Sequence, residues 1–230
     1  MPKKKTAQQI KKQYDKLIAV FRAFGVQSKP KVTRGVPDYS ASGMKAQKAL
    51  IPILQKRYES IDTTDWTVAK KVDYVLVGAQ IRGWQFEHDV LAPWKKDPAS
   101  YVPIDFQFGP KMHQAVPSHL LKAEHFADAA DSTQRDYLTE KVRAFEEILT
   151  QAKDNLSSRS SSPKTAHTML AVRNTPRQLA TMDQFIESLT QAGNPFAAEA
   201  TAARKAIKAF GQWAKQNRAT RTSTMPAGSA

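Results

Sequence analysis

The chain of 230 residues contains no cysteine. This absence excludes disulfide bonds, thiolate nucleophiles, cysteine-ligated zinc and iron–sulfur clusters. Glycine is scarce, with nine residues, and these form no loop of the kind that cradles phosphate groups. A Gly-x-Ser-x-Gly sequence is also missing, so the nucleophile elbow of serine hydrolases is excluded.

Long hydrophobic runs are missing as well. No stretch approaches the roughly 18 consecutive apolar residues that a membrane-spanning helix needs. The first residues, MPKKKTAQQIKKQ, are basic, but the apolar segment of a signal peptide does not follow them. We therefore expect a cytoplasmic protein with no membrane partner. The hydrophobic content of 41% is enough for a buried core.

Positive charge is present in excess, with a formal net charge of +14, but it is concentrated at the two ends. Residues 1–34 have a net charge of +9, residues 35–154 of −2 and residues 155–230 of +7. Basic ends bind polyanions weakly through counterion release. Aromatic residues do not interleave with the basic ones, as a stacking platform for nucleic acid would require.

Apolar residues recur at steps of three and four, which is the helical period. The sequence therefore predicts an all-α fold, a bundle of about six or seven helices with a long Pro-rich crossing loop at residues 94–117. We expect a basic N-terminal helix and linker at 1–34, a helical domain at 35–217 and a disordered tail at 218–230. Thr175, before Pro176, is expected to open a late helix as its N-cap.

The segment 67–92 carries apolar residues at steps of 4, 3, 4, 3 and 4. This spacing predicts a core-facing seam of about 26 residues, on the order of 39 Å long. The seam residues are Val72, Leu76, Ala79, Gly83, Phe86 and Val90. Residues 133–156 carry a similar seam on one predicted helix, and we expect the two seams to pack together.

Three neighbouring polar residues, Glu87, His88 and Asp89, lie near the end of that segment. Consecutive helical side chains point about 100° apart, so the three cannot close on one metal ion. The five histidines include no pair four residues apart with a Glu between them, as a zincin helix requires. We therefore assign no catalytic residue, no metal site and no cofactor from the residue pattern.

Two stretches, RGVPDYSASGMKAQ and SIDTTDWTVAKKVDYVLVGAQIRGWQFEHDVLAPWKKDPASYV, contain a series of short motifs. In this order they resemble the N-terminal half of the bacterial family called domain of unknown function 885. The matching positions are 35–39, Trp66, Asp73, Gly83, Phe86, 90–94 and 97–101. Gln80 and Arg82 stand where the family pattern has Glu and Asn, and Asp89 stands where it has Arg.

The resemblance implies a helical scaffold without the catalytic part. The larger members of the family resemble metallopeptidases whose metal-binding Glu and His residues lie in the C-terminal half, and this chain stops near where that half would begin. The implied partners are therefore a missing C-terminal catalytic half or a peptide ligand, and zinc belongs only to the longer relatives.

One face of the predicted helix 67–92 is the candidate site. Asp73, Gln80, Trp84 and Glu87 follow one another at steps of 7, 4 and 3, and we expect them to line a cleft. Two alternatives to a non-catalytic scaffold stay open. One is a basic helical nucleic-acid-binding protein that acts through residues 3–34 and 204–221, and the other is a hydrolase with an unrecognised site.

Overall fold

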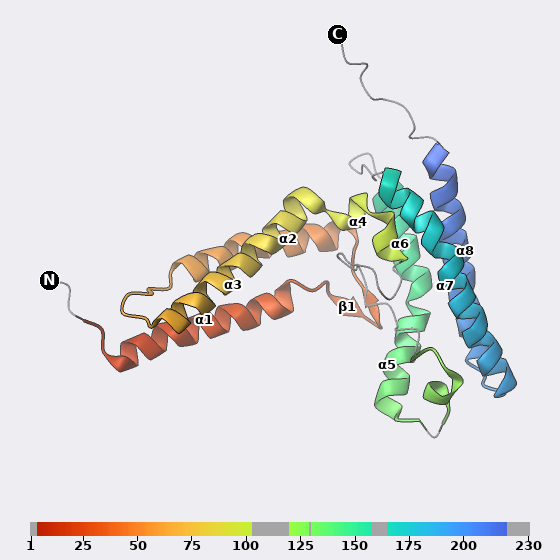
Figure 1. The fold of residues 1–230 in the computed structure, drawn as a ribbon, viewed down its shortest axis with the longest axis horizontal. Coiled ribbons are helices and arrows are strands. Elements are labelled where there is room, and N and C mark those ends of the chain that lie inside the picture. The colour runs from red at the N-terminus through yellow and green to blue at the C-terminus, as the bar shows by residue number, and fades with distance from the viewer. Residues whose placement is uncertain (1–3, 103–119, 129, 158–164, 220–230) are drawn as a thin grey trace, which may run out of the picture. The chain divides into compact units, whose positions relative to one another are not determined.

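The computed structural model describes residues 4–102, 120–128, 130–157 and 165–219 (Figure 1). It confirms the predicted all-α fold, since the only sheet among the described residues is a pair of two-residue strands. The chain forms two compact units. The first unit is Met1–Lys31 with Ala41–Leu91, and the second is Val32–Ser40 with Ala92–Ala230. Across the described ranges, the structure has no helix long and apolar enough to cross a membrane.

Three helices build the first unit, and they lie side by side in Figure 1. They are α1 (Ala7–Gln27), α2 (Ala41–Glu59) and α3 (Val68–Phe86), which continues into a π-helical turn, η1 (Glu87–Leu91). A capping box starts α1, because the Thr6 hydroxyl accepts from the Gln9 amide while the Gln9 side chain accepts from the Thr6 amide. Pro52 lies inside α2.

The core of the first unit takes residues from all three helices and from the α2–α3 connection. It consists of Leu17, Val20, Ile51, Leu54, Tyr58, Ile61, Trp66, Val77, Ile81 and Trp84. The basic helix α1 is thus part of a three-helix core and packs on both α2 and α3. This grouping differs from the predicted boundary at residue 34, because the apolar side of α1 is buried only by joining the two later helices.

The seam predicted on residues 67–92 was expected to face the core, but it faces solvent. Its members Val72, Leu76, Phe86 and Val90 are exposed, whereas the neighbouring Val77, Ile81 and Trp84 are buried. The apolar residues of α3 occupy more than one face, and α1 and α2 cover the face that carries Trp84. The segment 133–156, whose seam was expected to pack against this one, belongs to the other compact unit.

The second unit opens with a short hairpin of β1 (Val32–Thr33) and β2 (Val36–Pro37), paired antiparallel with Val32 opposite Pro37. Arg34 and Gly35 form its two-residue turn, and both have positive φ angles of 49° and 74°. Two short helices follow, α4 (Pro93–Lys96) and the 3₁₀ turn η2 (Pro98–Tyr101). These elements begin the predicted Pro-rich crossing, of which residues 103–117 lie outside the described ranges.

Longer helices make up the rest of the second unit. After the 3₁₀ turn η4 (Ala123–Phe126), these are α5 (Ser132–Arg143), α6 (Phe145–Ser157), α7 (Thr165–Gln191) and α8 (Ala197–Ala219). α7 and α8 lie side by side along their length (Figure 1). Of the tail predicted as disordered, residues 220–230 lie outside the described ranges, and 218 and 219 end α8.

Two predicted helix boundaries in this unit are wrong. The helix predicted at 133–156 is divided at Ala144 into α5 and α6. Thr175 does not open a helix, because α7 runs through Pro176 and the Thr175 hydroxyl donates to the Ala171 carbonyl at 2.8 Å. The helix tolerates Pro176 because Thr175 and Asn174 are buried among neighbouring elements that hold this segment helical.

Candidate functional site

The outward side of α3 is apolar. Seven large side chains of α3 and η1 are exposed, with exposed fractions between 43% and 79%. They are Val68, Val72, Val75, Leu76, Phe86, Val90 and Leu91, and we call them the α3 apolar face. Exposed apolar residues grouped on one side of a helix make that side a candidate interaction surface.

Three of the four predicted site residues border this face, and one does not. Asp73 accepts a 2.7 Å hydrogen bond from the Tyr14 hydroxyl, Gln80 is exposed, and Glu87 is half-buried. Trp84 is 4% exposed and packs edge-on against Phe24 in the core. The prediction that Trp84 lines a cleft is therefore wrong, because this indole is the part of α3 that α1 covers.

Glu87 begins the π-helical turn at the end of α3. Burial raises the pKa of its carboxyl group above the ordinary value for Glu. Within the described ranges, no hydrogen bond or ion pair offsets the desolvation of this carboxylate. A carboxylate in this state favours a neighbouring cation, which would restore the lost electrostatic stabilisation.

The two residues after Glu87 diverge from it, as expected. His88 is buried, and its Nε2 lies 2.9 Å from Gln47 Oε1, whereas Asp89 forms an ion pair with Lys48. Burial, and then the positive charge of Lys48, lowers the pKa of His88. Among the described residues, no group of three or more His, Asp or Glu side chains could hold a metal ion.

A Ser, an Asp and a His meet in the second unit, in an arrangement that the sequence did not reveal. Ser100 Oγ donates to Asp97 Oδ2 at 2.6 Å, and His167 Nδ1 lies 3.3 Å from Asp97 Oδ1. In a hydrolase triad the His stands between the Ser and the Asp, so that it can take the hydroxyl proton. Here Asp97 stands in the middle and also caps η2 by accepting from the Ala99 amide. The arrangement is therefore that of a structural cap.

Several positions of the family resemblance meet at one buried junction next to this cap. Asn155 Nδ2 donates to the Tyr39 carbonyl at 2.7 Å and to the Tyr101 hydroxyl at 3.3 Å, and that hydroxyl donates to the Trp94 carbonyl. Burial raises the pKa of Tyr101, so the phenol stays protonated. The motif residues Tyr39, Trp94 and Tyr101 thus hold the hairpin, α4 and η2 on α6.

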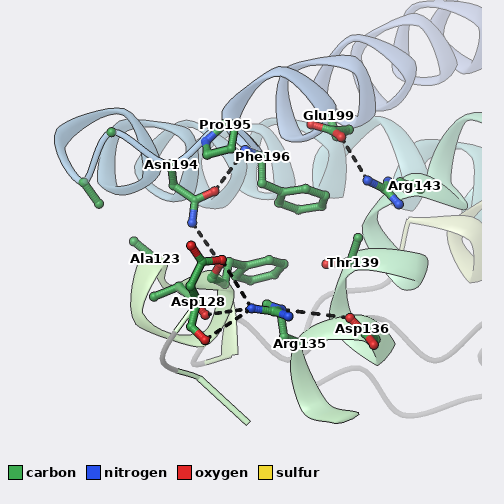
Figure 2. Close-up of a pocket in the computed structure, with 14 residues that line it drawn as sticks. Ala123, Asp128, Arg135, Asp136, Thr139, Arg143, Asn194, Pro195, Phe196 and Glu199 are labelled. Atoms are coloured by element: carbon green, nitrogen blue, oxygen red, sulfur yellow. Dashed lines mark hydrogen bonds and ion pairs between the residues drawn. The ribbon is translucent and has the colours of Figure 1, made fainter. Parts of the chain in front are cut away.

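The second unit also contains a pocket of about 520 Å³ (Figure 2). Its walls come from η4, α5, the turn between α7 and α8, and the start of α8. The sequence does not predict this pocket, because the lining residues come from four segments between 123 and 199 that share no motif. Arg135 and Arg143, spaced eight residues apart on α5, were the only local signal.

The chain matches no family model and no curated protein sequence. Among solved structures, it is similar to a putative lipoprotein of unknown function from Shewanella oneidensis, with a TM-score of 0.60 and 16% sequence identity. At this identity the likeness shows the fold alone. It covers 95% of this chain and 38% of that chain, so this chain spans well under half the length of that solved protein.

Proposed function

We propose that the chain is a non-catalytic helical scaffold that works with a second, helical polypeptide segment docked on the α3 apolar face. The exposure of that face carries the proposal. The proposal agrees with the resemblance to domain of unknown function 885, in which this portion would be the N-terminal half.

The geometry of the face suits an amphipathic helix. From Val68 to Leu91 it extends about 35 Å along the axis, at about 1.5 Å per residue. Leu76 and Val72 are 59% and 51% exposed, so a docked helix would remove a large apolar area from water. An amphipathic helix that lays its apolar side along such a stripe is a common recognition mode.

Polar residues border the face on both sides, and they predict the charge pattern of the partner. At about 100° per residue, Asp73, Gln80 and Glu87 lie along one edge, and Lys71 and Arg82 lie along the other. Interfaces of this kind have an apolar centre and a polar rim. We therefore expect a Lys or Arg of the partner beside Glu87, whose desolvated carboxylate would gain from it.

Purified protein tests the docking surface directly. We expect the wild-type chain to bind an apolar dye and to self-associate with rising concentration in sedimentation experiments, because an unpartnered apolar face drives association. The double variant Val72→Glu/Leu76→Glu should lose both properties. Val26→Glu/Met169→Glu, which changes one exposed apolar residue on α1 and one on α7, is the matched control and should retain them. A monomeric wild-type chain with no dye binding would contradict the proposal.

The non-catalytic part of the proposal has its own test. Elemental analysis of the purified protein should show no stoichiometric zinc, and a mixture of unstructured peptides should stay intact during incubation with it. Stoichiometric bound metal together with peptide turnover would show that the chain is a hydrolase, which is the second alternative from the sequence.

A further inference from the structure

The α3 apolar face follows the spacing of a coiled-coil seam. Five exposed positions of α3 alternate at steps of four and three residues, as the a and d positions of a heptad repeat do. They are Val72, Leu76, Ala79, Gly83 and Phe86. The π-helical turn that follows shifts the later positions, so the repeat is counted only to Phe86. In a coiled coil these positions are buried on a second helix, which the described residues do not supply.

The middle of this seam consists of small residues. Ala79 and Gly83 are one turn apart and lie between Leu76 and Phe86. A Cβ on Gly83 would meet nothing within 4 Å, so no other described part of the chain lies over this point. Small side chains allow two helix backbones to approach closely, while larger ones at either end pack around the contact. The seam is therefore shaped for close contact with another helix.

The two edges of the seam carry opposite charges. Arg82 directly precedes the a position Gly83, and Glu87 directly follows the d position Phe86, so they occupy g and e positions. Of the ion pairs formed within the described ranges, none includes Arg82 or Glu87. Arg82 lies beside the Tyr58 hydroxyl, which is neutral at physiological pH. Residues at e and g form ion pairs between the helices of a coiled coil, so both charges are placed for a partner.

These charges distinguish between two ways of pairing α3 with a second copy of itself. If the two helices run parallel about a two-fold axis, the edge with Arg82 faces the edge with Glu87 of the other copy. The two residues are then about 7.5 Å apart along the axis, which their long side chains can span, and symmetry makes the contact twice. An antiparallel pair brings like edges together and sets Glu87 beside the acidic edge that carries Asp73. Charge complementarity therefore favours the parallel pair.

We propose that the helix docked on the α3 apolar face is α3 of a second copy of this chain, in a parallel two-fold dimer that places Arg82 of each copy beside Glu87 of the other. This inference rests on the proposed function, since it names the occupant of the same face. α1 and α2 pack on the opposite side of α3, which carries Ile81 and Trp84. Because α3 is already folded on them, pairing does not require a new helix to form, and this lowers the entropic cost of association.

Sedimentation equilibrium of the full chain measures the stoichiometry. We expect a reversible monomer–dimer equilibrium that stops at two copies, because a two-fold contact occupies the face of both. A chain that binds the apolar dye but stays monomeric, or that associates without limit, would overturn the dimer and leave the proposed docking face in place. A monomer that also fails to bind the dye would remove both.

The lack of cysteine allows a direct cross-linking test. In the parallel dimer each seam residue meets its own counterpart, so Ala79→Cys should form an intermolecular disulfide under mild oxidation. Gln85→Cys places the thiol at an exposed position on another side of α3 and is the control, which should stay largely uncross-linked. Equal cross-linking of the two variants would overturn the proposed contact.

Charge reversal tests the direction of pairing. Arg82→Glu and Glu87→Arg should each raise the dissociation constant of the dimer by about tenfold, because two attractive contacts become repulsive. A mixture of the two variants should form a heterodimer of wild-type affinity, and the double variant Arg82→Glu/Glu87→Arg should regain the wild-type dissociation constant. Arg22→Glu makes the same charge change at an exposed position of α1 and should leave the dissociation constant unchanged. Single variants that pair as tightly as the wild type, or a double variant that stays weak, would show that the parallel arrangement is wrong.

Discussion

His88 Nε2 lies 2.9 Å from Gln47 Oε1, and this buried hydrogen bond joins the end of α3 to α2. The bond requires the ring nitrogen to be the donor and the amide oxygen the acceptor. Burial and the neighbouring Lys48 both disfavour the charged imidazolium, whereas Asp89 favours it to a lesser degree. The folded first unit therefore holds His88 neutral at a pH where an unfolded chain would protonate it.

The lowered pKa of His88 predicts destabilisation by mild acid. Below about pH 6.5 the unfolded chain takes up a proton at His88 that the folded chain does not, so the free energy of unfolding falls as the pH drops from there toward the folded pKa. Denaturant unfolding between pH 7.5 and 5.5 measures this slope. The double variant Gln47→Leu/His88→Leu should have a shallower slope, while Glu87 and the other histidines contribute equally to both proteins.

The single variant His88→Leu is the informative comparison. It leaves the side-chain oxygen of Gln47, Oε1, buried without its donor, which should lower the free energy of unfolding by about 1 to 3 kcal/mol at pH 7.5. The double variant should be closer to the wild type at that pH, because both polar partners are replaced by apolar groups. Equal pH slopes in the wild type and the double variant would show that His88 titrates normally.

A second prediction concerns the two sides of α3. Ile81 is fully buried in the first core, and Ile81→Ala should lower the free energy of unfolding by about 2 to 5 kcal/mol. Leu76 lies five residues earlier and is 59% exposed, so Leu76→Ala should lower the free energy of unfolding by less than about 1 kcal/mol. Urea unfolding of the two variants measures both values. The opposite order would place the core on the seam that the spacing of apolar residues predicted.

The predicted seam on α3 was wrong because this helix carries two apolar series. The series with Val72 and Leu76 and the series with Val77, Ile81 and Trp84 both follow the helical period, so periodicity alone cannot choose between them. The choice depends on which side α1 and α2 meet, and that is a tertiary interaction. The extra residue of the π-helical turn at Glu87–Leu91 also has no signature in the spacing.

Other parts of the fold follow from local rules and were predictable. The helical class follows from the spacing of apolar residues, and the divergence of Glu87, His88 and Asp89 follows because consecutive side chains point in different directions around a helix. The pocket around Arg135 and Phe196 was not predictable, because its lining residues come from separate segments. The helix through Pro176 was also missed, since Thr175 and Pro176 together satisfy the rules for a helix start, and burial overrides them.

A third prediction addresses the basic N-terminal region and nucleic acid. Lys11, Lys12 and Lys16 are exposed on α1, and we expect duplex DNA to bind weakly and without sequence preference. In fluorescence anisotropy, changing all three to Gln should make the dependence of log affinity on log salt less steep, by up to about three units of slope. The control changes Lys45, Lys56 and Arg57 to Gln and should leave the slope nearly unaltered. A clear preference for one sequence would instead favour a specific nucleic-acid-binding function.

A final prediction compares two glycines that share a left-handed backbone but differ in their surroundings. Gly35 has a φ of 74° and Gly193 a φ of 62°. A Cβ on Gly193 would meet nothing within 4 Å, whereas a Cβ on Gly35 would lie 2.8 Å from Glu140 Cβ and 3.0 Å from the Glu140 carbonyl oxygen. Gly193→Ala should therefore cost only the backbone strain, about 1 to 2 kcal/mol. Gly35→Ala adds an overlap that moves the hairpin off α5, for a further cost of about 1 to 3 kcal/mol. Equal losses in urea unfolding would mean that the hairpin does not pack against Glu140.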